Sequence, residues 1–245
     1  LEAWTGSLAY TFQLYFDFSG YTDMAWGAAL MFNIALPLNF NSPYKALDIQ
    51  DFWKRWHMTL SRFLKDYLYI PLGGGRKGTL FTYRNLLIVF LLGGLWHGAG
   101  WTFIIWGALH GIATITFYIW KKMAPMGLPR VIAWFLTFNF VNVTWVFFRA
   151  NTLGDALKVL KGMIGINGIA ILNAQSALAP GMINGYKSAL WLIAFALLIV
   201  LFMKNSVELS KRFTPTVTML CILAALFLAF LMRINTYSEF IYFQF

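Results

Sequence analysis

Residues 85–120 read NLLIVFLLGGLWHGAGWTFIIWGALHGIATITFYIW and contain no Lys, Arg, Asp or Glu. At about 1.5 Å of helical rise per residue, this length is enough for two crossings of a bilayer, with a break at Gly98-Ala99-Gly100. Only helices and closed barrels satisfy the backbone in lipid, and the alternating pattern of barrel strands is absent. The stretch therefore predicts an all-α, polytopic integral membrane protein.

The rest of the chain has the composition of a membrane protein. It is 60% hydrophobic and only 11% charged, whereas ordinary soluble domains carry roughly twice that charge. The further apolar regions are 7–36, 131–148, 188–203 and 216–232. Several are shorter than the ~20 residues of a straight span, so we expect tilted and broken transmembrane helices. No basic, soluble-looking domain accompanies the net charge of +10, so we expect membrane lipids as partners and no nucleic acid.

The unusual segment is 40–84, which holds eight basic and three acidic residues. Its apolar residues recur at helical spacing, with charged residues on the other side. This pattern predicts one basic amphipathic helix in the interface plane, begun by Asp48 as N-cap and ended before Pro71. Because positively charged segments stay inside, we expect 40–84 to face the cytoplasm. A second amphipathic stretch, 153–164, belongs to a connection that otherwise has the composition of a loop.

Two histidines, each beside a tryptophan, are the candidates for chemistry. His97 follows Trp96 in the charge-free stretch, where an ionisable side chain rarely lacks a task. A neutral imidazole can take a proton from a hydroxyl and return it near pH 7. The alternative is a core histidine that donates to a carbonyl. His57 follows Trp56 and would share a helix face with Trp53; it could equally be an interfacial histidine packed beside tryptophan.

Other motifs have simpler interpretations. His110 lies between glycines, and we expect it to pack. Histidines at 57, 97 and 110 could share a metal ion, but their spacing is not that of a metal site, so we expect none. The run 73–78, Gly-Gly-Gly-Arg-Lys-Gly, lacks the spacing of a phosphate loop, and we expect a turn at the headgroups.

Five motifs run through the chain in a recognisable order: Tyr15-Phe-Asp-Phe-Ser-Gly-Tyr-Thr-Asp-Met, Asn39-Phe-Asn-Ser-Pro-Tyr, Asp51-Phe-Trp-Lys-Arg-Trp-His-Met-Thr-Leu-Ser, Tyr69-Ile-Pro-Leu-Gly-Gly and Leu95-Trp-His-Gly-Ala-Gly-Trp. Together they resemble the membrane-bound O-acyltransferase family, and within it the bacterial branch that acts in alginate O-acetylation. The resemblance runs from about Gly6 to the end and corresponds to the second half of a full-length member. It implies that residues 1–245 are part of a single transmembrane acyltransferase domain.

The resemblance also implies which residues act. The near-invariant histidine of the family falls on His97, and its second catalytic position falls on His57. Family folds are rings of tilted helices around a tunnel, which donor and acceptor enter from opposite faces. The implied donor is acetyl-CoA or a similar thioester, with no cofactor, and the basic segment would attract its phosphates by charge. The candidate donor-binding residues are Trp53, Arg55, Trp56, Arg62, Lys65 and Trp96.

The implied location is the bacterial inner membrane, with several crossings. The implied partners, besides lipids and the thioester donor, are a periplasmic acetyltransferase and a polysaccharide acceptor. Two alternatives stay open within enzymes, namely transfer of D-alanine or of another acyl group to a cell-envelope polymer. A transporter or flippase whose two histidines relay protons is the alternative from another class. A membrane scaffold in which His97 only packs is a third interpretation.

Overall fold

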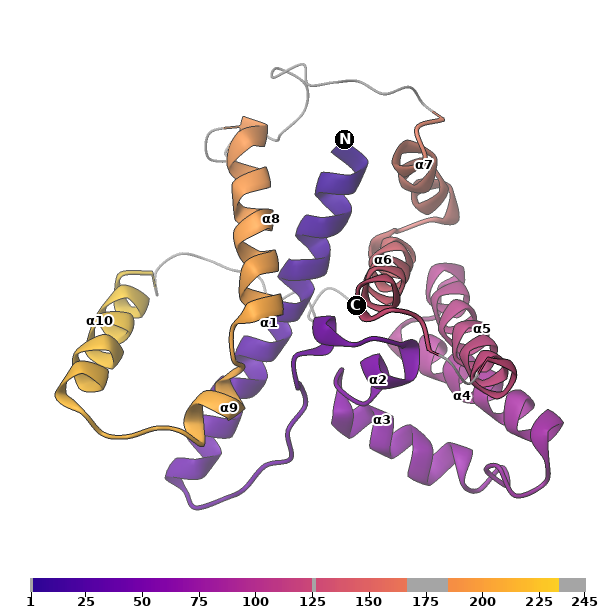
Figure 1. Ribbon diagram of the computed structural model, residues 1–245, viewed down its shortest axis with the longest axis horizontal. Helices are drawn as coiled ribbons and strands as arrows, with labels where there is room; N and C mark the ends of the chain where they lie inside the picture. Colours follow the sequence, from indigo (N-terminus) through magenta and orange to yellow (C-terminus); the bar gives the residue numbers. More distant parts are fainter. Residues whose placement is uncertain (1, 125–126, 167–184, 234–245) are drawn as a thin grey trace. The chain divides into compact units, whose positions relative to one another are not determined.

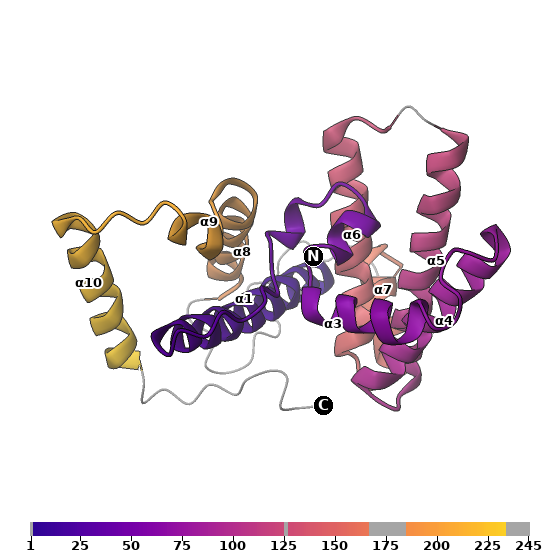
Figure 2. The same cartoon turned by 90° about the horizontal axis from the view of Figure 1, so that it is seen from below.

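The computed structural model describes residues 2–124, 127–166 and 185–233, and every regular element in these ranges is helical (Figures 1 and 2). The predicted all-α class of membrane protein is thereby confirmed. The chain divides into two compact units, Leu1–Met203 and Lys204–Phe245. The second unit contains α9 (Ser206–Ser210) and α10 (Val217–Arg233). The elements of the first unit are α1 (Glu2–Met31), the 3₁₀ turn η1 (Pro43–Lys45), α2 (Ile49–Trp53), α3 (Met58–Leu64), the π-helical turn η2 (Lys65–Tyr69), α4 (Thr79–His97), α5 (Trp101–Met123), α6 (Arg130–Arg149), α7 (Leu153–Met163) and α8 (Gly185–Phe202).

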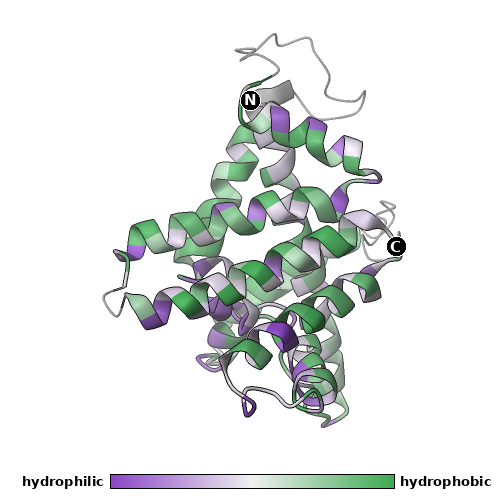
Figure 3. Cartoon of the chain, turned by 90° about the vertical axis from the view of Figure 1, so that its right-hand side faces the viewer, coloured by the Kyte–Doolittle hydropathy of each residue, from purple (hydrophilic) through white to green (hydrophobic). Residues whose placement is uncertain are grey.

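Three of the described helices, α4, α5 and α6, are long and apolar enough to cross a membrane. Figure 3 shows hydrophobic colouring along most of the length of the long helices. The apolar helices Ser188–Phe202 and Val217–Ala229 are shorter, as their sequences predict. The helix break expected at residues 98–100 lies between α4 and α5. Gly98 is required there, because a Cβ atom would lie 2.5 Å from the Phe103 ring.

Helices α4 and α5 pack against each other as an antiparallel hairpin through glycines. A Cβ atom on Gly94 would lie 2.3 Å from the Phe103 carbonyl oxygen, and one on Gly107 would lie 2.3 Å from the Phe90 carbonyl oxygen. Small residues let helix backbones approach this closely in lipid, where apolar side chains gain little by leaving the bilayer. The glycines therefore set the distance between the two helices.

The basic segment begins where the sequence predicts but is not one helix. The Asp48 carboxylate accepts from the Asp51 N–H at 2.7 Å and caps α2. The predicted continuous helix over this segment is wrong, because α2 ends at Trp53 and α3 begins only at Met58. His57 stands between them in the left-handed region, with φ +43°. The shared helix face inferred for His57 and Trp53 therefore does not exist.

The break is stabilised by a distant segment of chain. The Asn41 N–H donates to the Arg55 carbonyl at 3.0 Å, and the Met58 N–H donates to the Asn39 carbonyl at 3.0 Å. These bonds use backbone groups that a continuous helix would use internally. A hydrophobic period reports local spacing alone, so it could not predict this pairing.

The amphipathic stretch expected at 153–164 forms α7, which is capped by the Thr152 hydroxyl. Part of the connection expected around it lies outside the described residues. Helix α7 packs on α1 and α6, with Val146, Ala156 and Met163 at the centre of their contact. The end of α6 lies near the end of α4, where the rings of Phe148 and His97 are in contact.

Candidate active site

His97 is the last residue of α4 and is enclosed by aromatic rings. The ring centroids of Trp96, Trp106 and Phe148 lie 4.9, 5.3 and 5.0 Å from that of the imidazole. Trp106 comes from α5 and Phe148 from α6, so three helices meet at this side chain. The His97 imidazole is half-buried.

A groove of about 390 Å³ leads along α4 to His97. The α4 residues that line it recur every three or four positions, as one helix face does. They span about 22 Å at 1.5 Å per residue. Residues of α2, α3, η2 and α5 complete the walls, which are mostly apolar. The α4 residues are Thr82, Leu86, Val89, Phe90, Gly93 and His97.

Two lysines and a tyrosine are among the polar side chains that line the groove. Lys54 and Lys65 line it and are solvent-exposed. Tyr69 of η2 hydrogen-bonds to Thr82 at the far end of the α4 face from His97, and burial raises the pKa of the Tyr69 hydroxyl. A long apolar slot with two cations beside it suits an extended ligand that carries negative charge elsewhere.

His57 is half-buried and lies close enough to His97 for an electrostatic interaction between the two rings. Its Nδ1 atom lies 3.2 Å from the Asn39 side-chain oxygen. Burial lowers the pKa of His57 from 6.5 to about 4, so the imidazole is neutral at pH 7. The two histidines singled out in the sequence thus lie within range of an electrostatic interaction, although they are 40 positions apart in the chain.

His110 is fully buried, and both ring nitrogens have partners. The Trp53 indole N–H donates to Nδ1 at 3.2 Å. Nε2 lies 3.0 Å from the Thr144 hydroxyl, which itself donates to the Val141 carbonyl. His110 therefore connects α6 to Trp53, a wall residue of the groove. Sequence reasoning missed this connection, because nothing local relates residues 53 and 110.

The candidate donor-binding residues separate into two groups. Trp53 and Lys65 line the groove. The others are absent from the wall in the part of the chain that the structure describes: Arg62 and Trp96 are exposed, and Trp56 is buried in an aromatic core.

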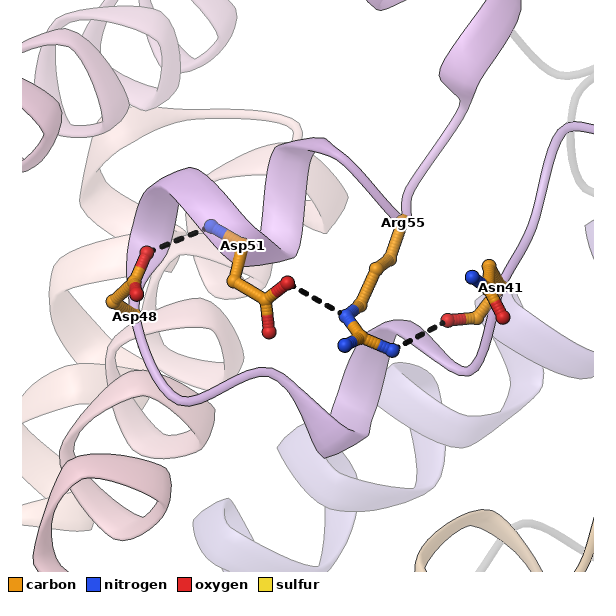
Figure 4. Close-up of polar contacts among 4 residues, drawn as sticks. All are labelled: Asn41, Asp48, Asp51 and Arg55. Carbon is orange, nitrogen blue, oxygen red and sulfur yellow. Dashed lines mark hydrogen bonds and ion pairs between the residues drawn. The ribbon is translucent and has the colours of Figure 1, made fainter. Parts of the chain in front are cut away.

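Arg55 is engaged elsewhere, as Figure 4 shows. Its Nε donates to the Asp51 carboxylate at 2.8 Å, and its NH1 group donates to the Asn41 carbonyl at 3.3 Å. Through these bonds Arg55 connects Asp51 of α2 to Asn41. The neighbouring Lys54 lines the groove and was missed by the sequence reasoning, since charge alone does not distinguish two adjacent cations.

Among the described residues, no three or more His, Cys, Asp or Glu side chains gather as they would around a metal ion. His110 could not serve as a ligand, since both its nitrogens are engaged. The arrangement of His97, His57 and the groove suits proton transfer beside a long apolar ligand.

Comparison with known proteins identifies the protein family of the chain. Residues 1–154 match the sequence profile of MBOAT, the membrane-bound O-acyltransferase family. The whole chain is 50% identical to the peptidoglycan O-acetyltransferase of Helicobacter pylori and covers 50% of that protein. It is 40% identical, again over its whole length, to the probable alginate O-acetylase AlgI of Pseudomonas putida, of which it covers 53%. Over 57% of the chain it is 31% identical to the teichoic acid D-alanyltransferase of Streptococcus thermophilus, of which 39% is covered.

The chain thus spans about half the length of the curated relatives that it matches over its whole length. The matched family region, 1–154, includes both histidines and every residue named above as lining the groove. The profile match and the similarity to both acetyltransferase relatives agree with the five sequence motifs. The chain belongs to the membrane-bound O-acyltransferase family.

Proposed function

We propose that the full-length protein transfers acetyl groups from a thioester, acetyl-CoA or a similar donor, to a hydroxyl group of a cell-envelope polysaccharide. The observation that carries the proposal is the groove that leads along α4 to His97. The names of the relatives support acetyl as the acyl group and peptidoglycan or an alginate-like exopolysaccharide as the acceptor. Among the alternatives, D-alanyl transfer is supported by a more distant relative.

In the proposed reaction, His97 is the general base. Its imidazole takes the proton from the acceptor hydroxyl while the hydroxyl oxygen bonds to the carbonyl carbon of the thioester. The carbon–sulfur bond then breaks, and the leaving thiolate takes the proton from the imidazolium. The products are the acetyl ester and a free thiol, and His97 is neutral again.

The surroundings of His97 support this chemistry. The aromatic rings of Trp106 and Phe148 and the apolar groove wall keep bulk water from the thioester, whose hydrolysis would waste the donor. His57, neutral and beside His97, has the role of orienting the acceptor through a hydrogen bond from a sugar hydroxyl.

The donor reaches the groove from the cytoplasmic side of a bacterial inner membrane that the protein crosses several times. Lys54 and Lys65 attract the phosphates of the donor by charge, since both line the groove and are exposed. Because its guanidinium is bonded to Asp51 and Asn41, Arg55 contributes to folding more than to donor capture. A periplasmic acetyltransferase is the proposed protein partner.

The test is acetyl transfer by the purified full-length protein from labelled acetyl-CoA to glycan fragments. His97→Ala should lower the rate by roughly 10²- to 10⁴-fold, as loss of a general base does. Gly27→Ala, a change with no atom within 4 Å of the added methyl group, is the control and should keep the wild-type rate. A His97→Ala protein with near-normal turnover would remove His97 from the mechanism, and a wild-type protein with no acyl transfer at all would favour transport. If the protein transferred D-alanine and no acetyl group, the proposed acyl group would be wrong, but acyl transfer itself would stand.

A further inference from the structure

The side-chain oxygen of Asn39 is the centre of a polar cluster beside His57. It accepts from the Thr59 backbone N–H at 3.2 Å and from the Thr59 hydroxyl at 2.6 Å. The His57 Nδ1 atom is its third neighbour, at 3.2 Å. The backbone carbonyl of Asn39 accepts from the Met58 N–H. Both the backbone and the side chain of Asn39 are therefore bonded to residues next to His57.

The chemistry of these neighbours decides which atom carries each proton. A backbone N–H can only donate, so the Asn39 atom that faces Thr59 is the amide oxygen and not the amide nitrogen. The oxygen has no proton to give. The contact with His57 is therefore a hydrogen bond in which Nδ1–H donates. A neutral imidazole has one N–H, so its Nε2 atom carries a lone pair.

The direction of that lone pair is also restricted. His57 lies in the left-handed backbone region, with φ +43° and ψ +56°, and the Phe18 ring packs against the imidazole at 4.9 Å, edge to face. The described residues offer no hydrogen-bond partner to Nε2. Some buried side-chain nitrogen and oxygen atoms of the described structure lack a hydrogen-bond partner, but Nε2 of His57 is not one of them. Nε2 is therefore not completely sealed within the described structure.

We propose that Asn39 is a positioning residue that holds His57 in the Nδ1–H tautomer, so that Nε2 accepts a hydrogen bond from a hydroxyl of the acceptor. Asn39 acts through His57 and does not touch the substrate. The inference rests on the proposed acyl transfer for its purpose, but the tautomer itself follows from the contacts of the Asn39 oxygen. With Asn39 removed, the imidazole could place its proton on either nitrogen and could turn.

The experiment measures the tautomer and the kinetics on the same full-length variants. ¹⁵N-histidine labelling and solid-state NMR at pH 8 distinguish a protonated from an unprotonated ring nitrogen, and His57→Gln identifies the His57 signals by their loss. The wild type should show an unprotonated Nε2. Asn39→Ala should lose this state, whereas Asn39→Asp should retain it, because a carboxylate oxygen also accepts from Nδ1–H.

In acetyl transfer, Asn39→Ala should lower kcat by up to roughly 10²-fold, as misplacement of a reacting group does, and should leave KM for the donor unchanged. Asn39→Asp should recover most of kcat. The matched control is Asn139→Ala in α6, where the amide donates to the Phe135 carbonyl of its own helix, and it should behave as the wild type.

Two results would overturn the inference: a wild-type His57 protonated on Nε2, or Asn39→Ala with unchanged kcat. If the wild type itself transferred no acetyl group, the proposed function would fail, and the NMR signals would still decide the tautomer.

Discussion

Gly107→Ala tests whether the α4–α5 contact holds the candidate site together. The added Cβ atom would lie 2.3 Å from the Phe90 carbonyl oxygen, whereas real Cβ atoms essentially never come within 3.0 Å of another heavy atom. The helices must therefore separate by at least about 0.7 Å, the difference between these two distances. Gly107 follows Trp106, which packs on His97, so the separation changes the surroundings of the imidazole.

Two effects of the substitution oppose each other. Alanine favours a helix over glycine by about 1 kcal/mol, while overpacking a close contact costs about 1–3 kcal/mol. Gly27→Ala isolates the first effect, since no atom lies within 4 Å of its added methyl group. We expect Gly107→Ala to unfold at a lower temperature than Gly27→Ala in a detergent melting assay.

Because a displacement of about 1 Å costs up to roughly 10²-fold in rate, kcat for acetyl transfer should fall about tenfold or more in Gly107→Ala. KM for the donor should change less, since Lys54 and Lys65, the exposed cations that line the groove, lie outside α4 and α5. If Gly107→Ala melted and turned over like the wild type, α4 and α5 would not be in the described contact.

Three further predictions follow from the site. Because burial lowers the pKa of His57 from 6.5 to about 4, its contribution to stability is complete above pH 6.5 and is lost as the pH falls toward 4; the melting temperature should drop less over this range in His57→Gln. His110→Leu leaves the N–H of the half-buried Trp53 without its acceptor and should cost about 0.5–1.5 kcal/mol, the net contribution of a typical hydrogen bond. His110→Gln should restore part of this loss in the same melting assay. The double variant Lys54→Gln/Lys65→Gln should raise KM for acetyl-CoA at low salt and much less at high salt. Arg62→Gln should leave KM unchanged, and an equal effect of Arg62→Gln would contradict the role of the two lysines in donor capture.

The features that the sequence predicts correctly have local causes. The break between α4 and α5 follows from three small residues within a charge-free run, and the cap at Asp48 follows from the preference of a carboxylate for the first free N–H groups of a helix. Each feature depends on a few residues that are neighbours in the sequence. Such features can therefore be predicted from the sequence without knowledge of the fold.

The features that were missed arise between distant segments. The helix break at His57 is stabilised by bonds to residues 39–41, and the groove wall at Trp53 is held by His110. Lys54 and Arg55 are adjacent cations, but one lines the groove and the other bonds to Asp51. Periodicity and charge do not report such pairings. The family motifs, by contrast, singled out both His57 and His97.

We propose that the groove along α4 brings the thioester donor to His97. The most direct measurement is photo-crosslinking of the full-length protein with an acetyl-CoA analogue that carries a diazirine near the thioester, followed by peptide mapping. We expect crosslinks to groove residues near His97, foremost Phe90, Gly93 and Trp106, and we expect unlabelled acetyl-CoA to compete with them. Crosslinks confined to the separate pocket around Asp23 and Pro37 would contradict it.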